Sequence, residues 1–85
     1  MNIKLLPQEK TGDSKFDSPI YMTNGFQTAF TTKAALVVNA AITEIQRLVN
    51  SKEGADYFQS FIADHIKFWV IDDGDHITFL LPEEY

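Results

Sequence analysis

The clearest pattern along the chain is an apolar stripe with helical spacing between residues 31 and 50. Because an α-helix turns by about 100° per residue, such spacing gathers the apolar side chains on one side of the helix. The pattern therefore predicts an amphipathic helix over residues 31–50, with Thr31 or Thr32 as its N-cap. Leu36 falls opposite the stripe. It is either an isolated exposed leucine or, with Ala40, part of a second contact surface.

Apolar residues alternate with others in two stretches, 66–71 and 76–81, on either side of the turn Asp72-Asp73-Gly74-Asp75. This alternation predicts a β-hairpin over residues 66–81. A tight turn centred on Asp73-Gly74 would form three apolar pairs on one face, namely Val70 with Ile77, Phe68 with Phe79, and Ile66 with Leu81. The other face is mixed and presents Trp69, Ile71 and Leu80, which suits partial cover or an interface.

The remaining segments are less regular. Residues 3–6 suit a short edge strand, and residues 7–19 are polar and are expected to form an exposed loop. Residues 20–30 are rich in strand-forming residues, so Asn24-Gly25 suggests a hairpin turn, or a strand that bends there and leads into the helix. Residues 55–65 have helical spacing but many aromatic residues, so the pattern favours a helix and leaves a strand as the alternative.

Together these elements predict one small α+β domain over residues 1–85. We expect an antiparallel sheet of three or more strands, with the hairpin at its centre. The long helix is expected to pack on one face of that sheet.

Composition narrows the function classes. The chain has 85 residues, no cysteine and a formal net charge of −5. The lack of cysteine excludes disulfides, thiolate metal sites and a cysteine nucleophile. The acidic balance argues against direct binding to nucleic acid. The sequence has neither a secretory signal pattern nor an apolar run long enough to span a bilayer, so we expect a cytoplasmic protein without membrane contact.

Few residues suggest chemistry. Asp72, Asp73, Asp75 and His76 are close in sequence and could hold a divalent cation, but aspartate and glycine are also what a hairpin turn requires. His65 and His76 are the only histidines, and no hydrolase, nucleotide-binding or zinc-protease motif accompanies them. We therefore expect a protein that is not an enzyme and that uses neither a cofactor nor a metal.

Several short motifs resemble one family of small proteins. Tyr21, Thr23 and Gly25 match its Tyr-x-Thr-x-Gly segment, and residues 56–61 are similar to its Asp-Tyr-x-Gln-x-Phe strand. Over residues 20–85 the chain thus resembles the domain-of-unknown-function family nine-sixty, which occurs in bacteria and phages. The resemblance implies an α+β fold and a strand at residues 56–61. It carries over no catalytic residues, because that family has no established activity.

Two hypotheses for function arise. The first is non-enzymatic protein–protein interaction, in its simplest form a homodimer, with Leu36, Trp69, Ile71 and Leu80 as interface candidates. The second starts from charge, because residues 1–52 carry +2 and residues 53–85 carry −7. In that hypothesis the protein is a phage or mobile-element inhibitor whose acidic face mimics nucleic acid and blocks a basic partner. The residues assigned to that face are Asp72, Asp73, Asp75, Glu83 and Glu84.

Overall fold

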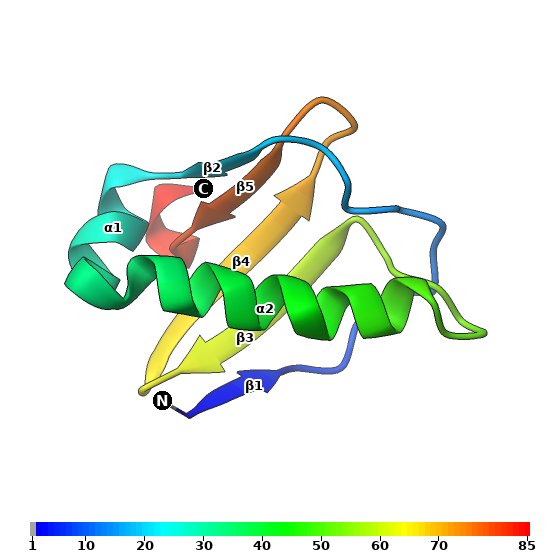
Figure 1. The fold of residues 1–85 in the computed structure, drawn as a ribbon, viewed down its shortest axis with the longest axis horizontal. Coiled ribbons are helices and arrows are strands. Elements are labelled where there is room, and N and C mark those ends of the chain that lie inside the picture. The colour runs from blue at the N-terminus through cyan, green and yellow to red at the C-terminus, as the bar shows by residue number, and fades with distance from the viewer. Residues whose placement is uncertain (1) are drawn as a thin grey trace.

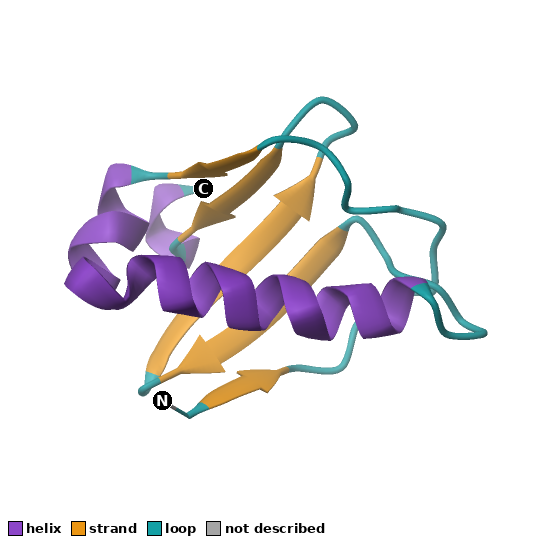
Figure 2. Ribbon diagram, in the orientation of Figure 1, coloured by secondary structure: helices purple, strands orange, loops and turns teal. Residues whose placement is uncertain are grey.

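The computed structural model describes residues 2–85 as one sheet with two helices on one of its faces (Figures 1 and 2). The strands are β1 (Ile3–Leu5), β2 (Ile20–Met22), β3 (Phe58–Ala63), β4 (Ile66–Asp72) and β5 (Ile77–Leu80). The helices are α1 (Asn24–Phe30) and α2 (Ala34–Val49), and the short 3₁₀ turns are η1 (Thr31–Lys33) and η2 (Pro82–Glu84). The predicted α+β class is confirmed.

The sheet has five strands in the order β1-β3-β4-β5-β2. The predicted hairpin lies at its centre, and the predicted edge strand at residues 3–6 is β1. Three of the neighbouring pairs are antiparallel, but β2 runs parallel to β5, so the sheet is mixed and not purely antiparallel. The reason is the route of the chain. Residues 18 and 19 lie beside the β4–β5 turn, where Ile77 N–H donates to Pro19 O (2.8 Å), and β2 then runs in the direction of β5.

The predicted register of the central hairpin is wrong by two residues. Val70 lies opposite Phe79, and Asp72 lies opposite Ile77. The turn is longer than expected because the Asp73 carboxylate accepts hydrogen bonds from the backbone N–H groups of Asp75 (2.9 Å) and His76 (2.8 Å). A shift of two leaves every side chain on its predicted face, whereas a shift of one would have inverted them all.

Residues 58–63 form a strand, as the family resemblance implied, and the helix favoured by the residue spacing is wrong. Both faces of β3 carry apolar residues, because Phe61 faces α2 while Phe58 lies on the other face. That arrangement imitates helical spacing. Asp64 and His65 join β3 to β4 with φ angles of 50° and 69°, the signs that a two-residue type I′ hairpin turn requires.

The hairpin suggested at Asn24-Gly25 is also wrong, and the alternative of a strand leading into a helix holds. Thr23 is the N-cap of α1, and its hydroxyl accepts from Phe26 N–H (3.2 Å). Thr31 does not cap the long helix. Its φ of 51° places a β-branched residue in the left-handed region, where the chain bends between α1 and α2.

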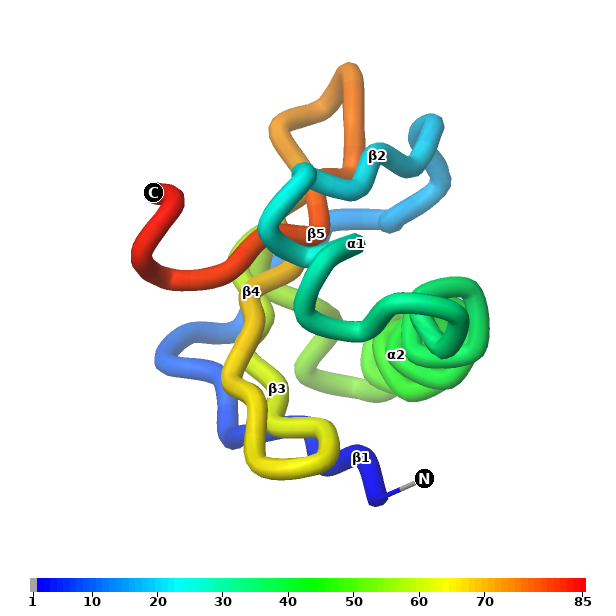
Figure 3. Tube along the Cα trace, turned by 90° about the vertical axis from the view of Figure 1, so that its left-hand side faces the viewer, coloured from blue at the N-terminus to red at the C-terminus, as the bar shows by residue number. Residues whose placement is uncertain are grey.

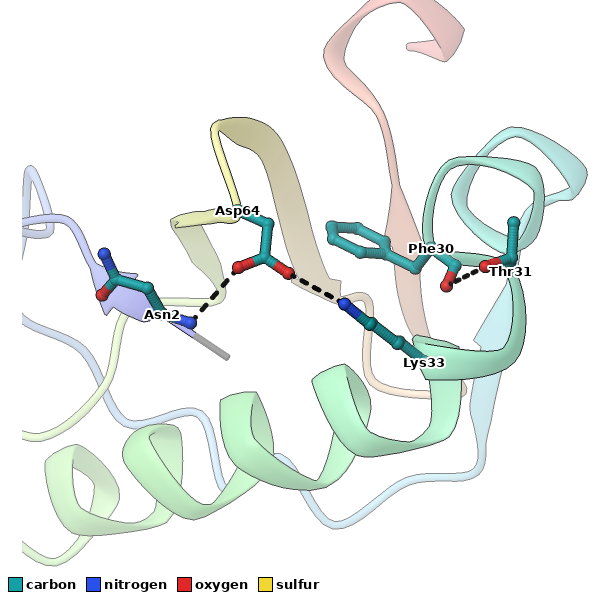
Figure 4. A network of polar contacts seen from close by, with 5 residues as sticks. All are labelled: Asn2, Phe30, Thr31, Lys33 and Asp64. Carbon is teal, nitrogen blue, oxygen red and sulfur yellow. Dashed lines mark hydrogen bonds and ion pairs between the residues drawn. The ribbon is translucent and has the colours of Figure 1, made fainter.

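Lys33, at the end of this bend, reaches the opposite layer. Its ammonium lies 3.9 Å from the Asp64 carboxylate in the β3–β4 turn, and Asp64 also accepts from Asn2 N–H at 3.3 Å (Figure 4). The ion pair is exposed to solvent, so it adds little stability. It does mark where the start of α2, the β3–β4 turn and the start of β1 meet.

Aromatic packing fills the space between the helices and the sheet. The ring of Phe68 in β4 lies 5.2–6.1 Å from those of four other phenylalanines, all of them buried, namely Phe26, Phe30, Phe61 and Phe79. Edge and offset contacts at these distances add to the gain from burying the rings. The loop of residues 6–19 is pinned to this core by Phe16, which is buried. The Asp72 carboxylate accepts from Ser14 Oγ (2.5 Å) and from Phe16 N–H (3.2 Å).

Two substitutions on opposite sides of α2 test this layering. Ile45 is fully buried against the sheet, so Ile45→Val should lower the free energy of unfolding by about 0.5–1.5 kcal/mol, measured by urea denaturation. Leu36 on the outer side of the same helix is 60% exposed, so Leu36→Ala should change it by less than about 0.5 kcal/mol. A reversed order of the two effects would contradict the packing of α2.

Candidate interaction surface on the open face of the sheet

The two faces of the sheet are covered to different extents by the rest of the chain. Both helices lie on one face, and the opposite face, which we call the open face, is seen on the left of the turned view in Figure 3. Strand alternation and register place these residues on the open face: Phe58, Ser60 and Ile62 of β3, Lys67, Trp69 and Ile71 of β4, and Thr78 and Leu80 of β5. Among residues 2–85, only two short segments cross this face, the chain after β1 and the C-terminal turn η2.

Four aromatic side chains form a continuous line along the open face, which we call the aromatic row. Ring centroids are 6.4 Å apart for Tyr57 and Phe58, 5.0 Å for Phe58 and Trp69, and 5.6 Å for Trp69 and Tyr85. Tyr57 is 58% exposed and Tyr85 is 82% exposed. Aromatic side chains combine large apolar area with polar tips, and they are enriched at protein interfaces for that reason.

A groove of about 420 Å³ runs beside the aromatic row. Its floor includes Phe58, Ser60, Lys67 and Trp69, and one wall is the chain from Leu6 to Lys10. That wall is anchored at two points, Leu6 and Gln8. Leu6 N–H donates to Ser60 O (2.9 Å), and the Gln8 side chain accepts from Asp56 N–H and from Gln59 Nε2, both at 2.9 Å. Ordered backbone thus supports the groove.

The four interface candidates from the sequence do not form one patch. Trp69 and Ile71 are half-buried and lie together on the open face. Leu36 lies on the outer side of α2, in the other layer of the molecule. Leu80 is beside Trp69 in the register but is only 7% exposed, so it offers little area to a partner in this conformation.

Sequence reasoning missed Tyr57, Phe58 and Tyr85. The first two were assigned to a helix, which would have separated them from Trp69. The third lies in a tail without a recognisable pattern. A strand at residues 58–63 would have been signal enough for Phe58, because it sets this residue on the same face as Trp69.

The five acidic candidates do not form a continuous face either. Asp72, Asp73 and Asp75 lie at the turn before β5, and Glu83 and Glu84 lie in the turn after it, so the two groups are at opposite ends of this strand. Asp72 and Asp73 also use their carboxylate oxygens within the protein. Asp72 binds the loop at Ser14 and Phe16, and Asp73 binds the backbone of its own turn.

Neither histidine is placed for acid–base catalysis by a cluster of partners. His65 occupies the β3–β4 turn, and the His76 ring lies 4.6 Å from that of Tyr21. Within the described range 2–85, no three histidine, aspartate or glutamate side chains come together as a metal site would require. The helices in that range are too short or too polar to cross a bilayer.

Comparisons of the sequence with protein-family models and curated proteins, and of the fold with solved structures, found no significant match. The function of the protein must therefore be inferred from the geometry of the open face.

The hydrogen bonds in the turn before β5 should make the stability of the protein depend on pH. The N–H groups of His76 and Asp75 bind the Asp73 carboxylate and lower its pKa below the ordinary value of 3.8. A carboxylate with a lowered pKa stabilises the fold above its ordinary pKa, and this stabilisation is lost as the pH falls through the folded-state value. Asp73→Asn should therefore be less stable than the wild type at pH 7 in urea denaturation. The difference should shrink towards zero as the pH falls below about 4. A difference that persists unchanged into acid would show that the charge on Asp73 contributes nothing.

Proposed function

We propose that this protein is a non-enzymatic interaction module and that a second copy of the chain packs on its open face. The observation that supports this proposal best is the aromatic row, which lies on the side of the sheet opposite both helices. Exposed apolar side chains that are scattered singly are normal, whereas a contiguous aromatic line is typical of a contact surface.

The size of the open face suits a dimer. The molecule measures 34 × 26 × 20 Å, and the shortest axis runs through the helical layer and the sheet, so the two longer extents frame the open face. A stable interface buries about 800 Å² on each partner, which a face of these dimensions can supply.

The charges of the open face also favour self-pairing. At one end of the sheet, Lys4 and Lys67 lie on either side of Ile62 in the register. At the other end, the β4–β5 turn carries Asp73 and Asp75. If two copies face each other with their β4 strands antiparallel, Trp69 and Ile71 meet near the two-fold axis. The lysine end of each copy then lies over the aspartate end of the other.

Removal of the central aromatic tests the proposal. Sedimentation velocity at micromolar concentrations should show a dimer for the wild type. Trp69→Ala should weaken it by about 2 kcal/mol or more, or roughly 30-fold in Kd, as for a central hot-spot residue. Tyr57→Ala, which removes an exposed side chain of the same row, should also weaken the dimer with little effect on folding. The matched control is Leu36→Ala on the other layer, which should leave the dimer unchanged. A wild type that stays monomeric, or equal behaviour of all three variants, would refute the proposed interface.

Charge reversal tests the antiparallel arrangement separately. Lys67→Glu and Asp75→Lys should each weaken the dimer, because each places like charges opposite one another. The double variant should recover much of the loss, since the two ends are then complementary again. The recovery should fade at high salt, where exposed charges are screened. If the two losses simply add in the double variant, the two ends do not meet in the dimer.

A further inference from the structure

Glu84 joins the C-terminal turn to the start of α1. Its carboxylate accepts hydrogen bonds from Thr23 Oγ1 (2.5 Å) and from Gly25 N–H (3.1 Å), and also from Leu81 N–H (2.9 Å) at the start of η2. The first N–H groups of a helix have no partner within the helix, so a carboxylate there supplies one. A side chain 59 positions away in the sequence thus completes the first turn of α1.

The glycine at position 25 leaves room for this contact. A Cβ atom at residue 25 would lie only 2.5 Å from the carboxyl carbon of Glu84, much closer than van der Waals contact. Gly25 has no positive φ that would demand glycine for its backbone. The Glu84 carboxylate thus occupies the space that a side chain at this position would take, so the two cannot both stay where they are.

The same turn places a ring on the aromatic row. Tyr85 meets Trp69 edge to face, with an interplanar angle of 76°. Leu80 lies next to Trp69 on the open face and is nevertheless buried. Both helices are on the other side of the sheet, and η2 contacts β4 and lies on the open side near the end of β5 (Figure 3). The turn thus covers the part of the open face around Trp69 and Leu80.

We propose that residues 82–85 form a latch on the open face, that the ionised carboxylate of Glu84 holds the latch closed, and that its opening exposes Trp69 and Leu80. A neutral carboxyl carries a proton on one oxygen and accepts less well, so it cannot serve three donors as the carboxylate does. Protonation of this one group is therefore enough to weaken the contacts to Thr23 and Gly25 at the start of α1 and the contact to Leu81 together.

The surroundings of Glu84 make it the group that responds. Residues 23–30 contain no titratable side chain and Leu81 is apolar, so the segments that donate hydrogen bonds to Glu84 bring no second titratable side chain. Its own turn adds Glu83 and Tyr85, and β4, which η2 contacts, carries Lys67 on the open face. The hydroxyl of Thr23, followed by the N–H groups of Leu81 and Gly25, lowers the pKa of Glu84 below its ordinary value of 4.5. The latch is accordingly closed at neutral pH and opens as the pH falls below that ordinary value.

The latch can be measured apart from any association. Its effect on dimer formation rests on the proposed function, because opening uncovers Leu80 and moves Tyr85 away from the aromatic row. The opening itself is a property of one copy of the chain. Trp69 is the only tryptophan, so its fluorescence reports this site alone.

The experiment is acrylamide quenching of Trp69 fluorescence at a concentration where sedimentation shows a monomer. Glu84→Gln removes the charge, and Gly25→Ala displaces the carboxylate at a position where alanine otherwise favours the helix. Both should raise the quenching constant to the value measured for Tyr85→Ala, which lacks the covering ring. Glu83→Gln makes the same charge change one residue away, and it should match the wild type. Unchanged far-UV circular dichroism shows that each variant is folded.

A pH titration tests the predicted direction of the change, which is opening of the latch as the pH falls. In the wild type, quenching should rise as the pH falls below about 4.5, the ordinary glutamate value, before the loss of circular dichroism that marks acid unfolding. Glu84→Gln should show the high value throughout. If Glu84→Gln and Gly25→Ala both quench like Glu83→Gln, there is no latch, whatever the oligomeric state. If they quench strongly but no dimer forms at any concentration, the latch stands and the proposed dimer falls.

Discussion

The fold is constrained by how few residues remain to cover the two faces of the sheet. Five strands present two faces, and 85 residues provide one long helix and one short helix. Both helices pack on the same face, where Phe68 and the phenylalanines around it exclude water. Small domains bury a smaller share of their surface than large ones, and this chain obtains a dense core by placing its buried phenylalanine rings in a single layer. The price is a second face with aromatic side chains and no helix over it.

The second face is partly covered, not by an α-helix, but by a loop and a short 3₁₀ turn. Residues 6–10 lie along one side of it and η2 lies along the other, with Trp69 between them. Both segments are held by side-chain hydrogen bonds from distant parts of the chain, through Gln8 on one side and Glu84 on the other. The open face is therefore shaped by a few polar contacts, in contrast to the helical face, which is shaped by packing.

Much of this architecture could be predicted from the sequence where one side of an element is apolar and the other polar. The stripe containing Ile45 predicted α2, and the alternation around Phe68 predicted which hairpin residues face the core. The predictions failed where both sides of an element are apolar, or where a residue far away in the sequence determines the local conformation. Phe58 and Phe61 make both faces of β3 apolar, so periodicity could not distinguish strand from helix.

The candidate site shows the same division. Trp69 and Ile71 were identified because alternation places them away from the core. Leu80 was assigned to the same surface correctly by direction, but the turn that buries it could not be predicted. The Asn24-Gly25 pair indicated a reverse turn by local chemistry, whereas its conformation is set by the Thr23 cap and by a carboxylate from the other end of the chain. Contacts between residues so far apart in the sequence do not produce a periodic pattern of apolar and polar residues, so they could not be predicted from it.

The two outermost strands, β1 and β2, are only three residues long. Unpaired backbone along the rim of a sheet is the usual starting point for uncontrolled strand addition and fibre growth, and short rims offer few hydrogen bonds for it. Lys4, a charged residue within β1, further discourages an added strand there. Because its sheet ends in such short strands, the molecule can expose a broad side-chain surface to solvent without offering a long backbone edge for strand addition.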